Sequence, residues 1–152
     1  MAKILLLSGP NLNLLGEREP EHYGTTTLAE LVALVGETAA KLGHDVEHVQ
    51  SNHEGALIDA IHAARGRCAA VVINAGAFSH YAYAISDALA TFEGVKIEVH
   101  LSNPYARERW RHRSVVSPVV DGTITGLRAD GYRLAVEAVA ARLAGDAAQG
   151  QS

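Results

Sequence analysis

The chain alternates between short continuous apolar runs and longer segments in which apolar residues recur every three or four positions. Two runs, Ile4 to Leu7 and Ala69 to Ile73, are apolar throughout and are typical of strands buried on both faces of a parallel sheet. Asp45 to Gln50 alternates weakly and indicates an edge strand, and Val95 to His100 indicates a fourth strand. A last strand with an irregular beginning is predicted over Val115 to Ile124.

Helices are predicted between these strands from the spacing of apolar residues. The first runs from Leu28 to Leu42, with Thr26 or Thr27 as its cap and Gly43 as its stop. The others are expected over Glu54 to Arg65, from about His80 or Tyr81 to Thr91, in a short arginine-rich segment after Pro104, and over Tyr132 to Leu143. Strands that alternate with helices in this way predict an α/β fold.

The simplest arrangement of these elements is a doubly wound, flavodoxin-like three-layer sandwich, with a five-stranded parallel sheet in the order 2-1-3-4-5. Residues 1–145 are expected to form a single domain, and the small, polar residues 146–152 a disordered tail. Ligands of such folds bind beyond the carboxyl ends of the strands. The loops after Leu7, Ile73 and Val99 are therefore expected to converge on one site.

The stretch from Ser8 to Gly24 is the most informative of these loops. It is long, polar and irregular, and such loops in compact domains are usually functional. It contains Asn11, which can orient a water or hold an oxyanion, Arg18, which is permanently charged, and Tyr23, which can transfer a proton. Each residue taken alone also has a structural explanation, as a turn cap, a solvated charge and a ring packed on the sheet.

Glu98 and His100 are two residues apart on a predicted strand, so their side chains point to the same face. A carboxylate beside an imidazole selects one tautomer and favours a charged ring, which can then donate a proton. The alternatives are an exposed ion pair and half of a metal site. A metal site needs further ligands, and the sequence contains neither HExxH nor a Cys/His cluster, so no metal is expected.

Further polar groups follow the third and fourth strands. Asn74 and His80 flank a glycine turn, where they could hold hydroxyls or an anion; helix capping is the alternative, and for Asn74 alone it is the better one. Ser102 and the amides around it are expected to form a similar anion-binding turn. Arg107 and Arg111, four residues apart, are expected to share one helix face, which could meet an acidic substrate.

Composition narrows the class of protein. The chain has 152 residues, of which 48% are hydrophobic and 20% are charged, as in one soluble globular domain. A net charge of -4 argues against general nucleic-acid binding, and the single cysteine, Cys68, excludes an internal disulfide and suits a reducing compartment. The apolar run before Ser8 is too short for a signal peptide or a membrane span, so we expect a cytoplasmic protein.

Two kinds of chemistry are disfavoured. GPNLNLLG lacks the lysine and the hydroxyl residue of a P-loop, and no GxGxxG follows a strand. The lysines lie at strand beginnings or near a helix end, on the wrong side of the sheet for a Schiff base. What remains is a base and an acid from separate strands, which imply proton abstraction coupled to the loss of a leaving group.

The blocks that contain these residues resemble type II 3-dehydroquinate dehydratases, in the same order, from Ile4 to about Leu143. They are GPNLNLLGEREPEHYG, QSNHEGALIDAIH, INAGAFSH, IEVHLSNPYARERWRHRS and SPVVDGTITGLRADGY. The resemblance implies a flavodoxin-like catalytic domain, a dodecamer built of trimers, and a reaction that needs neither metal nor organic cofactor. It also implies conversion of 3-dehydroquinate to 3-dehydroshikimate by anti elimination of water through an enolate, in the shikimate pathway or in quinate breakdown.

The resemblance assigns roles to the candidate residues. Tyr23 would remove the C2 proton, held as tyrosinate by Arg18, and Asn11 would position a water that stabilises the enolate. His100, backed by Glu98, would protonate the departing C1 hydroxyl. The other positions would bind substrate or complete the site: the amides of Leu101 and Ser102 at the carboxylate, Asn74, His80 and Arg111 at the ring hydroxyls, Arg107 in the lid and in setting the local charge, and Asp87 in the site of a neighbouring subunit.

The chain departs from the family pattern near Asp87. Tyr81 stands where a threonine is expected, and Ser86 precedes the aspartate where an arginine is common. These differences concern the predicted trimer contacts, whereas the catalytic positions match. Two alternatives are a flavodoxin-like module that binds a nucleotide or phosphate, and a relative that keeps the oligomer without the chemistry. The strand ends carry Asn, His and Ser rather than a flavin loop or an acidic phospho-acceptor cluster, which disfavours the first.

Overall fold

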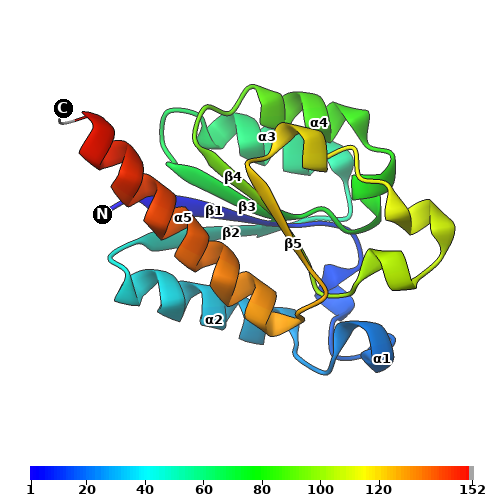
Figure 1. Ribbon diagram of the computed structural model, residues 1–152. Helices are drawn as coiled ribbons and strands as arrows, with labels where there is room; N and C mark the ends of the chain where they lie inside the picture. The colour runs from blue at the N-terminus through cyan, green and yellow to red at the C-terminus, as the bar shows by residue number, and fades with distance from the viewer. Residues whose placement is uncertain (151–152) are drawn as a thin grey trace.

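The five predicted strands form one parallel sheet. A computed structural model describes residues 1–150 and orders the strands β2-β1-β3-β4-β5, as predicted (Figure 1). The strands are β1 (Lys3–Ser8), β2 (Asp45–Gln50), β3 (Ala70–Asn74), β4 (Val95–His100) and β5 (Gly122–Thr125). The first four agree with the predicted runs to within one residue at each end. β5 is shorter than predicted, because the chain before it turns through a short 3-10 helix, η5 (Ser117–Val119).

Helices cover both faces of the sheet and complete the predicted three-layer sandwich (Figure 1). α2 (Leu28–Lys41) and α5 (Ala129–Gly150) pack on one face. α3 (Glu54–Ala64) and α4 (Tyr83–Ala90) pack on the other. The flavodoxin-like α/β architecture is therefore confirmed.

β1 divides the core between the two faces. Side chains alternate along a strand, so Ile4 and Leu6 pack towards α2 and α5, whereas Leu5 and Leu7 pack towards α3 and α4. All four side chains are at most 1% exposed. Burial of one such side chain contributes about 1.5–3 kcal/mol, so a polar residue here would destabilise the strand that ends at the site.

The boundaries of α2 follow the predicted local signals. The Thr27 side chain accepts a hydrogen bond from the Glu30 amide at 3.2 Å, which satisfies one of the free amides at the helix start. The helix ends at Lys41, and Gly43 adopts a φ of 84°, in the left-handed region that follows many helices. Thr27, rather than Thr26, is thus the cap.

The loops at the carboxyl edge contain short helical turns that the apolar pattern did not predict. The first loop includes η1 (Leu12–Leu14) and α1 (Pro20–Tyr23). After β3, η2 (Gly76–His80) precedes α4, so the third helix begins at Tyr83, later than predicted. Helices this short have no room for an apolar period, and they depend on contacts with the rest of the fold.

The arginine-rich segment is not the single helix that was expected. It forms two 3-10 helices, η3 (Pro104–Ala106) and η4 (Arg109–His112). Arg107 lies between them with extended backbone angles, so the prediction that it shares a helix face with Arg111 is wrong. Both side chains nevertheless reach the same pocket, because the segment bends over it.

α5 is longer than its predicted core-facing part. It begins at Ala129 and continues through Gly150, so the prediction of a disordered tail is wrong for residues 146–150. Residues 151 and 152 lie outside the described residues. Alanine is the strongest helix former, and the alanines in this stretch favour continuation of the helix in the absence of an apolar face.

The first and third strands end side by side. Ser8 pairs with Asn74 in the sheet register, and the Gly9 amide donates to the Asn74 carbonyl oxygen at 2.8 Å. A Cβ atom at Gly9 would clash with the carbonyl oxygen of Ala75, so this close approach requires glycine. It brings the first loop against the turn after β3, at the point where the strand order reverses.

None of the helices described in residues 1–150 combines the length and the apolar character that crossing a membrane requires.

Candidate active site

A pocket opens at the carboxyl edge of β1, β3 and β4, under the first loop and the arginine-rich segment. All of the predicted site residues except Glu98 and Asp87 line it. The other lining residues are Pro10, Leu12, Gly76, Ala77 and Pro104. The predicted convergence of three loops on one site is therefore confirmed.

Tyr23 lies between two guanidinium groups. Arg107 Nη1 donates a hydrogen bond to the Tyr23 hydroxyl at 2.6 Å, and Arg18 Nη2 donates one at 3.3 Å. The guanidinium carbons also lie 5.0 Å and 4.5 Å, respectively, from the centroid of the tyrosine ring. Two permanently charged hydrogen-bond donors therefore contact the Tyr23 oxygen, the atom that takes up a proton if this tyrosine acts as a base.

Arg107 connects the arginine-rich segment to the first loop. Its side chain is only 4% exposed, and its Nη2 pairs with Glu19 Oε2 at 3.2 Å. Its Nη1 also approaches the Ser102 hydroxyl at 3.4 Å, and within the described residues its Nε is buried without a hydrogen-bond partner. One buried cation thus contacts two residues of the first loop, Glu19 and Tyr23, and Ser102 in the turn after β4.

Glu98 and His100 form the predicted pair. His100 Nε2 lies 2.7 Å from Glu98 Oε2, and Glu98 is completely buried, so the alternative of an exposed ion pair is wrong. Burial raises the pKa of Glu98, but hydrogen bonds from His100, Ser117 and Ser114 outweigh burial and hold the pKa below its ordinary value. The ionised carboxylate can only accept, so Nε2 donates to it and Nδ1 is left to exchange a proton with a ligand.

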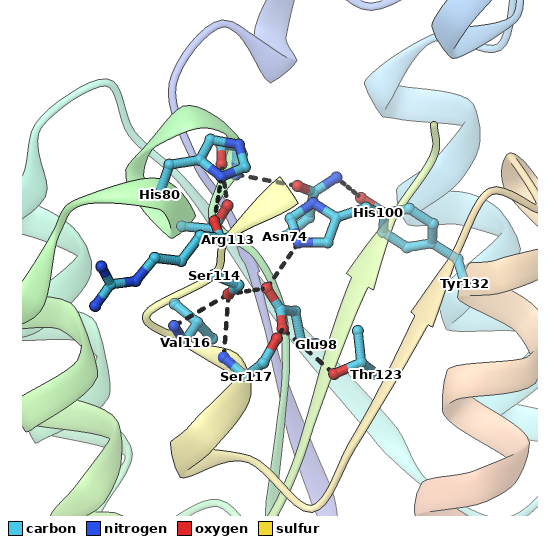
Figure 2. A network of polar contacts seen from close by, with 12 residues as sticks. Asn74, His80, Glu98, His100, Arg113, Ser114, Val116, Ser117, Thr123 and Tyr132 are labelled. Carbon is cyan, nitrogen blue, oxygen red and sulfur yellow. Dashed lines mark hydrogen bonds and ion pairs between the residues drawn. The ribbon is translucent and has the colours of Figure 1, made fainter. Parts of the chain in front are cut away.

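The alternative that this pair is half of a metal site finds no support in the surrounding groups. Within residues 1–150, histidine, cysteine, aspartate and glutamate form no group of three that could hold a metal ion. Both oxygens of Glu98 are also occupied, Oε2 by His100 and Ser114, and Oε1 by Ser117 and Thr123 (Figure 2). A carboxylate bonded in this way has little capacity left for a metal.

Asn74 is held at both ends of its side-chain amide. Its Oδ1 accepts a hydrogen bond from the Gly76 amide at 3.1 Å, and its Nδ2 donates to the Tyr132 hydroxyl at 2.9 Å (Figure 2). Because a backbone N–H can only donate, the orientation of the amide is determined. Burial raises the pKa of Tyr132 to about 12, so its hydroxyl stays neutral. Asn74 therefore caps the turn through Oδ1 and can offer its second Nδ2 hydrogen to a ligand.

His80 is oriented as a hydrogen-bond acceptor. Its Nδ1 lies 2.7 Å from the backbone carbonyl oxygen of Arg113, so Nδ1 carries the proton and Nε2 the lone pair (Figure 2). Trp110 packs edge-on against the ring, with 5.3 Å between ring centroids. Burial lowers the pKa of His80, and the nearby His100 and Arg111 lower it further. A neutral His80 can accept a hydrogen bond from a ligand hydroxyl.

The remaining predicted residues surround these groups. Leu101 and Ser102 form the turn directly after β4 and line the pocket. Asn11 adopts a φ of 68°, in the left-handed region, and its side chain makes no capping bond to the described residues. Arg111 pairs with Glu108 at 2.6 Å while it lines the pocket from η4. The amide of Asn11 and a third cation, Arg111, are therefore available in the pocket that holds the tyrosine and the two histidines.

Comparison of the sequence with models of known protein families shows to which family the chain belongs. The family model for class II dehydroquinases matches residues 2–140, which include all of the predicted site residues. The chain belongs to the class II dehydroquinase family. The family expected from the five sequence blocks is thereby confirmed.

Individual relatives of this class II dehydroquinase are similar to it in sequence, and in one case in structure, over most of their length. A 3-dehydroquinate dehydratase of Bacillus licheniformis is 54% identical over 136 residues, which are 90% of this chain and 94% of that protein. The 3-dehydroquinate dehydratase 2 of Pseudomonas putida is 56% identical over 88% of this chain and 89% of that protein. The crystal structure of a type II dehydroquinase from Propionibacterium acnes is 48% identical, with a TM-score of 0.88 over 93% of this chain and 97% of that one.

Asp87 is the one predicted substrate-binding residue that the fold of this dehydroquinase keeps away from its own pocket. It is exposed on α4. Tyr81 and Tyr83, at the beginning of that helix, are 58% and 59% exposed. A site contribution from Asp87 therefore requires a second subunit, and the trimer contacts predicted from the family resemblance stay a prediction.

Several residues that hold the side chains of the dehydroquinase site in place were not predicted from the sequence. Glu19 pairs with Arg107, Tyr132 binds Asn74, and Ser114 and Ser117 bind Glu98. Tyr132 was counted among the regularly spaced apolar residues of the last predicted helix. Ser114 and Ser117 resembled ordinary turn residues, and Ser117 directly precedes a proline. The one usable signal was the polar, irregular stretch before β5, which follows the arginines directly.

Proposed function

We propose that this class II dehydroquinase catalyses the dehydration of 3-dehydroquinate to 3-dehydroshikimate, by anti elimination of water through an enolate. The two relatives from Bacillus licheniformis and Pseudomonas putida bear the name 3-dehydroquinate dehydratase. The observation that supports the proposal most is the placement of two proton-transfer groups in one pocket, with Tyr23 beside two guanidinium groups and His100 beside a buried carboxylate. Removal of a proton and a hydroxyl from neighbouring carbons needs such a base and such an acid.

Tyr23 is the base in this proposal. As tyrosinate it takes the proton from C2 of the substrate, and the electron pair of the C–H bond moves into the enolate. Asn11 positions a water that donates to the enolate oxygen. Arg107 is buried and closer to the hydroxyl than Arg18, so it makes the larger electrostatic contribution to the tyrosinate.

His100 is the acid. With Nε2–H donated to Glu98, it transfers a proton from Nδ1 to the C1 hydroxyl, which leaves as water while the enolate electrons form the new double bond. The proton gained by Tyr23 balances the proton lost by His100, and the two exchange through solvent before the next turnover. Glu98 stays ionised, so it stabilises the charged ring of His100 before the proton transfer. After the transfer it keeps the neutral ring in the same orientation by accepting from Nε2–H.

The other pocket residues bind the substrate in this proposal. The amides of Leu101 and Ser102 hold the carboxylate. Asn74 donates to one ring hydroxyl, and His80 accepts from another through Nε2, as their fixed orientations require. Arg111 completes the set, so the pattern of donors and acceptors selects a polyhydroxylated acid.

We further propose that the protein works as a dodecamer built of trimers, in which Asp87 contributes to the site of a neighbouring subunit. Asp87 is exposed on α4 and does not line the pocket of its own chain, which supports a shared site. The mechanism uses only side chains and water, so neither a metal nor an organic cofactor has a role in it. We place the enzyme in the cytoplasm, in the shikimate pathway or in quinate breakdown.

An ultraviolet assay of the purified protein tests the function directly. Treatment with EDTA and with borohydride precedes addition of 3-dehydroquinate, and growth of the conjugated enone absorbance reports dehydration. Turnover that survives both treatments, and that a Tyr23→Phe preparation lacks, supports the proposal and excludes a contaminating enzyme. No turnover from a folded oligomer would favour the noncatalytic relative that the sequence left open.

A further inference from the structure

We propose that Ser114 and Ser117 are positioning residues for His100, because they hold the Glu98 carboxylate in the orientation that this histidine needs. The inference deepens the proposed function and rests on it for its kinetic test. Ser114 lies between η4 and η5, and Ser117 is the first residue of η5; in the segment of residues 113–117 the only ionisable side chain is that of Arg113.

The first argument is the burial of Glu98. Its side chain has no exposed surface, so an ionised carboxylate there requires protein donors in place of water. His100 and Ser114 donate to Oε2, at 2.7 Å and 2.8 Å. Ser117 donates to Oε1, where the other contact is Thr123 at 3.4 Å. Without Ser117, one oxygen of the carboxylate would keep only this long contact.

The second argument is that the Ser114 hydroxyl can point in only one direction. Its oxygen accepts hydrogen bonds from the amides of Val116 and Ser117, both at 3.1 Å. These two bonds occupy its lone pairs, so the single hydroxyl proton is directed to Glu98 (Figure 2). Ser114 is therefore a fixed donor, and a freely rotating hydroxyl would not orient the carboxylate in the same way.

The third argument is that the same segment is anchored beside the other pocket histidine. The Arg113 carbonyl accepts from His80 Nδ1 at 2.7 Å (Figure 2). The Val115 amide donates to the Ser79 carbonyl at 2.7 Å. Five consecutive residues thus set the ring orientation of one histidine directly and that of the other through Glu98. This arrangement gives the segment a role in the site and not only in the turn before β5.

Loss of either serine has a definite chemical consequence. Serine donors help to keep the pKa of Glu98 low, so their removal raises that pKa and brings protonation of the carboxyl to higher pH. The titratable groups that face Glu98 are His100 on the same strand and His80 from η2, with Arg111 near His80. Once Glu98 is protonated, its negative charge no longer stabilises the charged ring of His100 that donates the proton, and the acid of the reaction is lost.

The kinetic test compares Ser114→Ala and Ser117→Ala with two control variants. Each alanine variant is expected to lower kcat by about 10-fold, the usual effect of losing a hydrogen bond to a charged group, with KM changed by less than about 3-fold. The acidic limb of the kcat profile is expected to move to higher pH. Ser117→Thr keeps the hydroxyl and should restore the profile.

Ser79→Ala is the control for the loss of a nearby serine hydroxyl that does not contact Glu98. Its hydroxyl donates to the Gly76 carbonyl at 2.8 Å and does not contact Glu98, so its substitution should leave the position of the acidic limb unchanged. An acidic limb that moves equally in Ser79→Ala, or that stays in place in both test variants, would overturn the proposal. If an alanine variant does not fold, Ser117→Cys, with a weaker donor of similar size, should show a smaller shift in the same direction.

A second measurement needs no turnover. NMR spectra that correlate the ring protons with the ring nitrogens over two bonds report the tautomer of each neutral histidine. They are recorded on substrate-free protein with nitrogen-labelled histidine, and the signals missing from His100→Gln are those of His100. The intact protein should show Nε2–H at His100, and the double variant Ser114→Ala/Ser117→Ala a mixture of tautomers. An unchanged His100 pattern would refute the positioning role. Absence of turnover in the intact protein would refute the proposed function instead, and the spectra would still decide the role of the serines.

Discussion

Arg107 donates a 2.6 Å hydrogen bond to the hydroxyl of Tyr23, although 84 positions separate the two residues in the sequence. The same guanidinium pairs with Glu19, one residue before the short helix that ends at Tyr23. The candidate base is therefore positioned by a buried cation from the opposite side of the pocket, and not only by its neighbour Arg18.

Replacement of the tyrosine hydroxyl should abolish turnover. Tyr23→Phe removes the base and little shape, so we expect activity to fall below a few per cent while binding of the substrate, measured by calorimetry, is largely kept. A variant that retains more than a few per cent of the activity would contradict the assignment of Tyr23 as the base.

The two arginines that contact Tyr23 should differ in importance. Arg107→Gln is expected to lower kcat by about 100-fold or more, and Arg18→Gln by about 10-fold, because hydrogen bonds to charged groups are stronger when short and buried. Glu19→Gln serves as control: its carboxylate is 47% exposed, so its loss should change kcat by less than about 3-fold. The measurement is the steady-state kcat of the three variants. A lower kcat for Arg18→Gln than for Arg107→Gln would contradict this order.

His100→Ala should lower the turnover rate about as strongly as Tyr23→Phe does. Loss of a general acid typically lowers the rate by about 100-fold to 10,000-fold. The pH profile of the intact enzyme should have one acidic and one basic limb, and a flat profile from about pH 6 to 9 would argue against an acid and base pair.

Mixed oligomers can test whether Asp87 completes a neighbouring site. Asp87→Ala and Tyr23→Phe should each be inactive or strongly impaired alone. When the two are unfolded together and refolded, some subunit interfaces should combine an intact Asp87 with an intact Tyr23, and activity should return. If refolded mixtures stay as inactive as their parents while intact protein refolds normally, Asp87 acts within its own chain or not at all.

The buried carboxylate of Glu98 and the half-buried ring of His80 should both make the fold acid-sensitive. The pKa of Glu98 is lower in the folded state than its ordinary 4.5, so its contribution to stability is present above that pH and is lost as the pH falls below it. The pKa of His80 is lower than its ordinary 6.5 because the ring is half-buried, so the unfolded chain takes up a proton first and stability falls below pH 6.5. Denaturant unfolding of Glu98→Gln and His80→Asn should show a shallower loss of stability in the corresponding pH range. A slope equal to that of the intact protein would contradict these assignments.

Local patterns were sufficient for the main elements and for the predicted partners on one strand. Glu98 and His100 were predicted to share a face because the side-chain period of a strand is two, and their 2.7 Å contact confirms it. The arginine-rich segment shows the limit of such patterns. A spacing of four residues would place Arg107 and Arg111 on one helix face, but tertiary contacts with Tyr23 and Glu19 hold Arg107 in extended backbone between two short turns.

By itself, the sequence determined where the main strands and helices lie and which chemical groups the loops between them carry, because apolar periodicity and residue type act locally. The strand order was predicted only as the simplest arrangement of those elements, and the structure confirms it. Only the tertiary structure decided which of these groups hold one another: Arg107 on Tyr23, Tyr132 on Asn74, and the serines on Glu98. These contacts join residues from different elements, and their distances depend on how helices and loops pack on the sheet. Buried polar groups need partners of suitable geometry, and a linear pattern does not specify which distant residue supplies them.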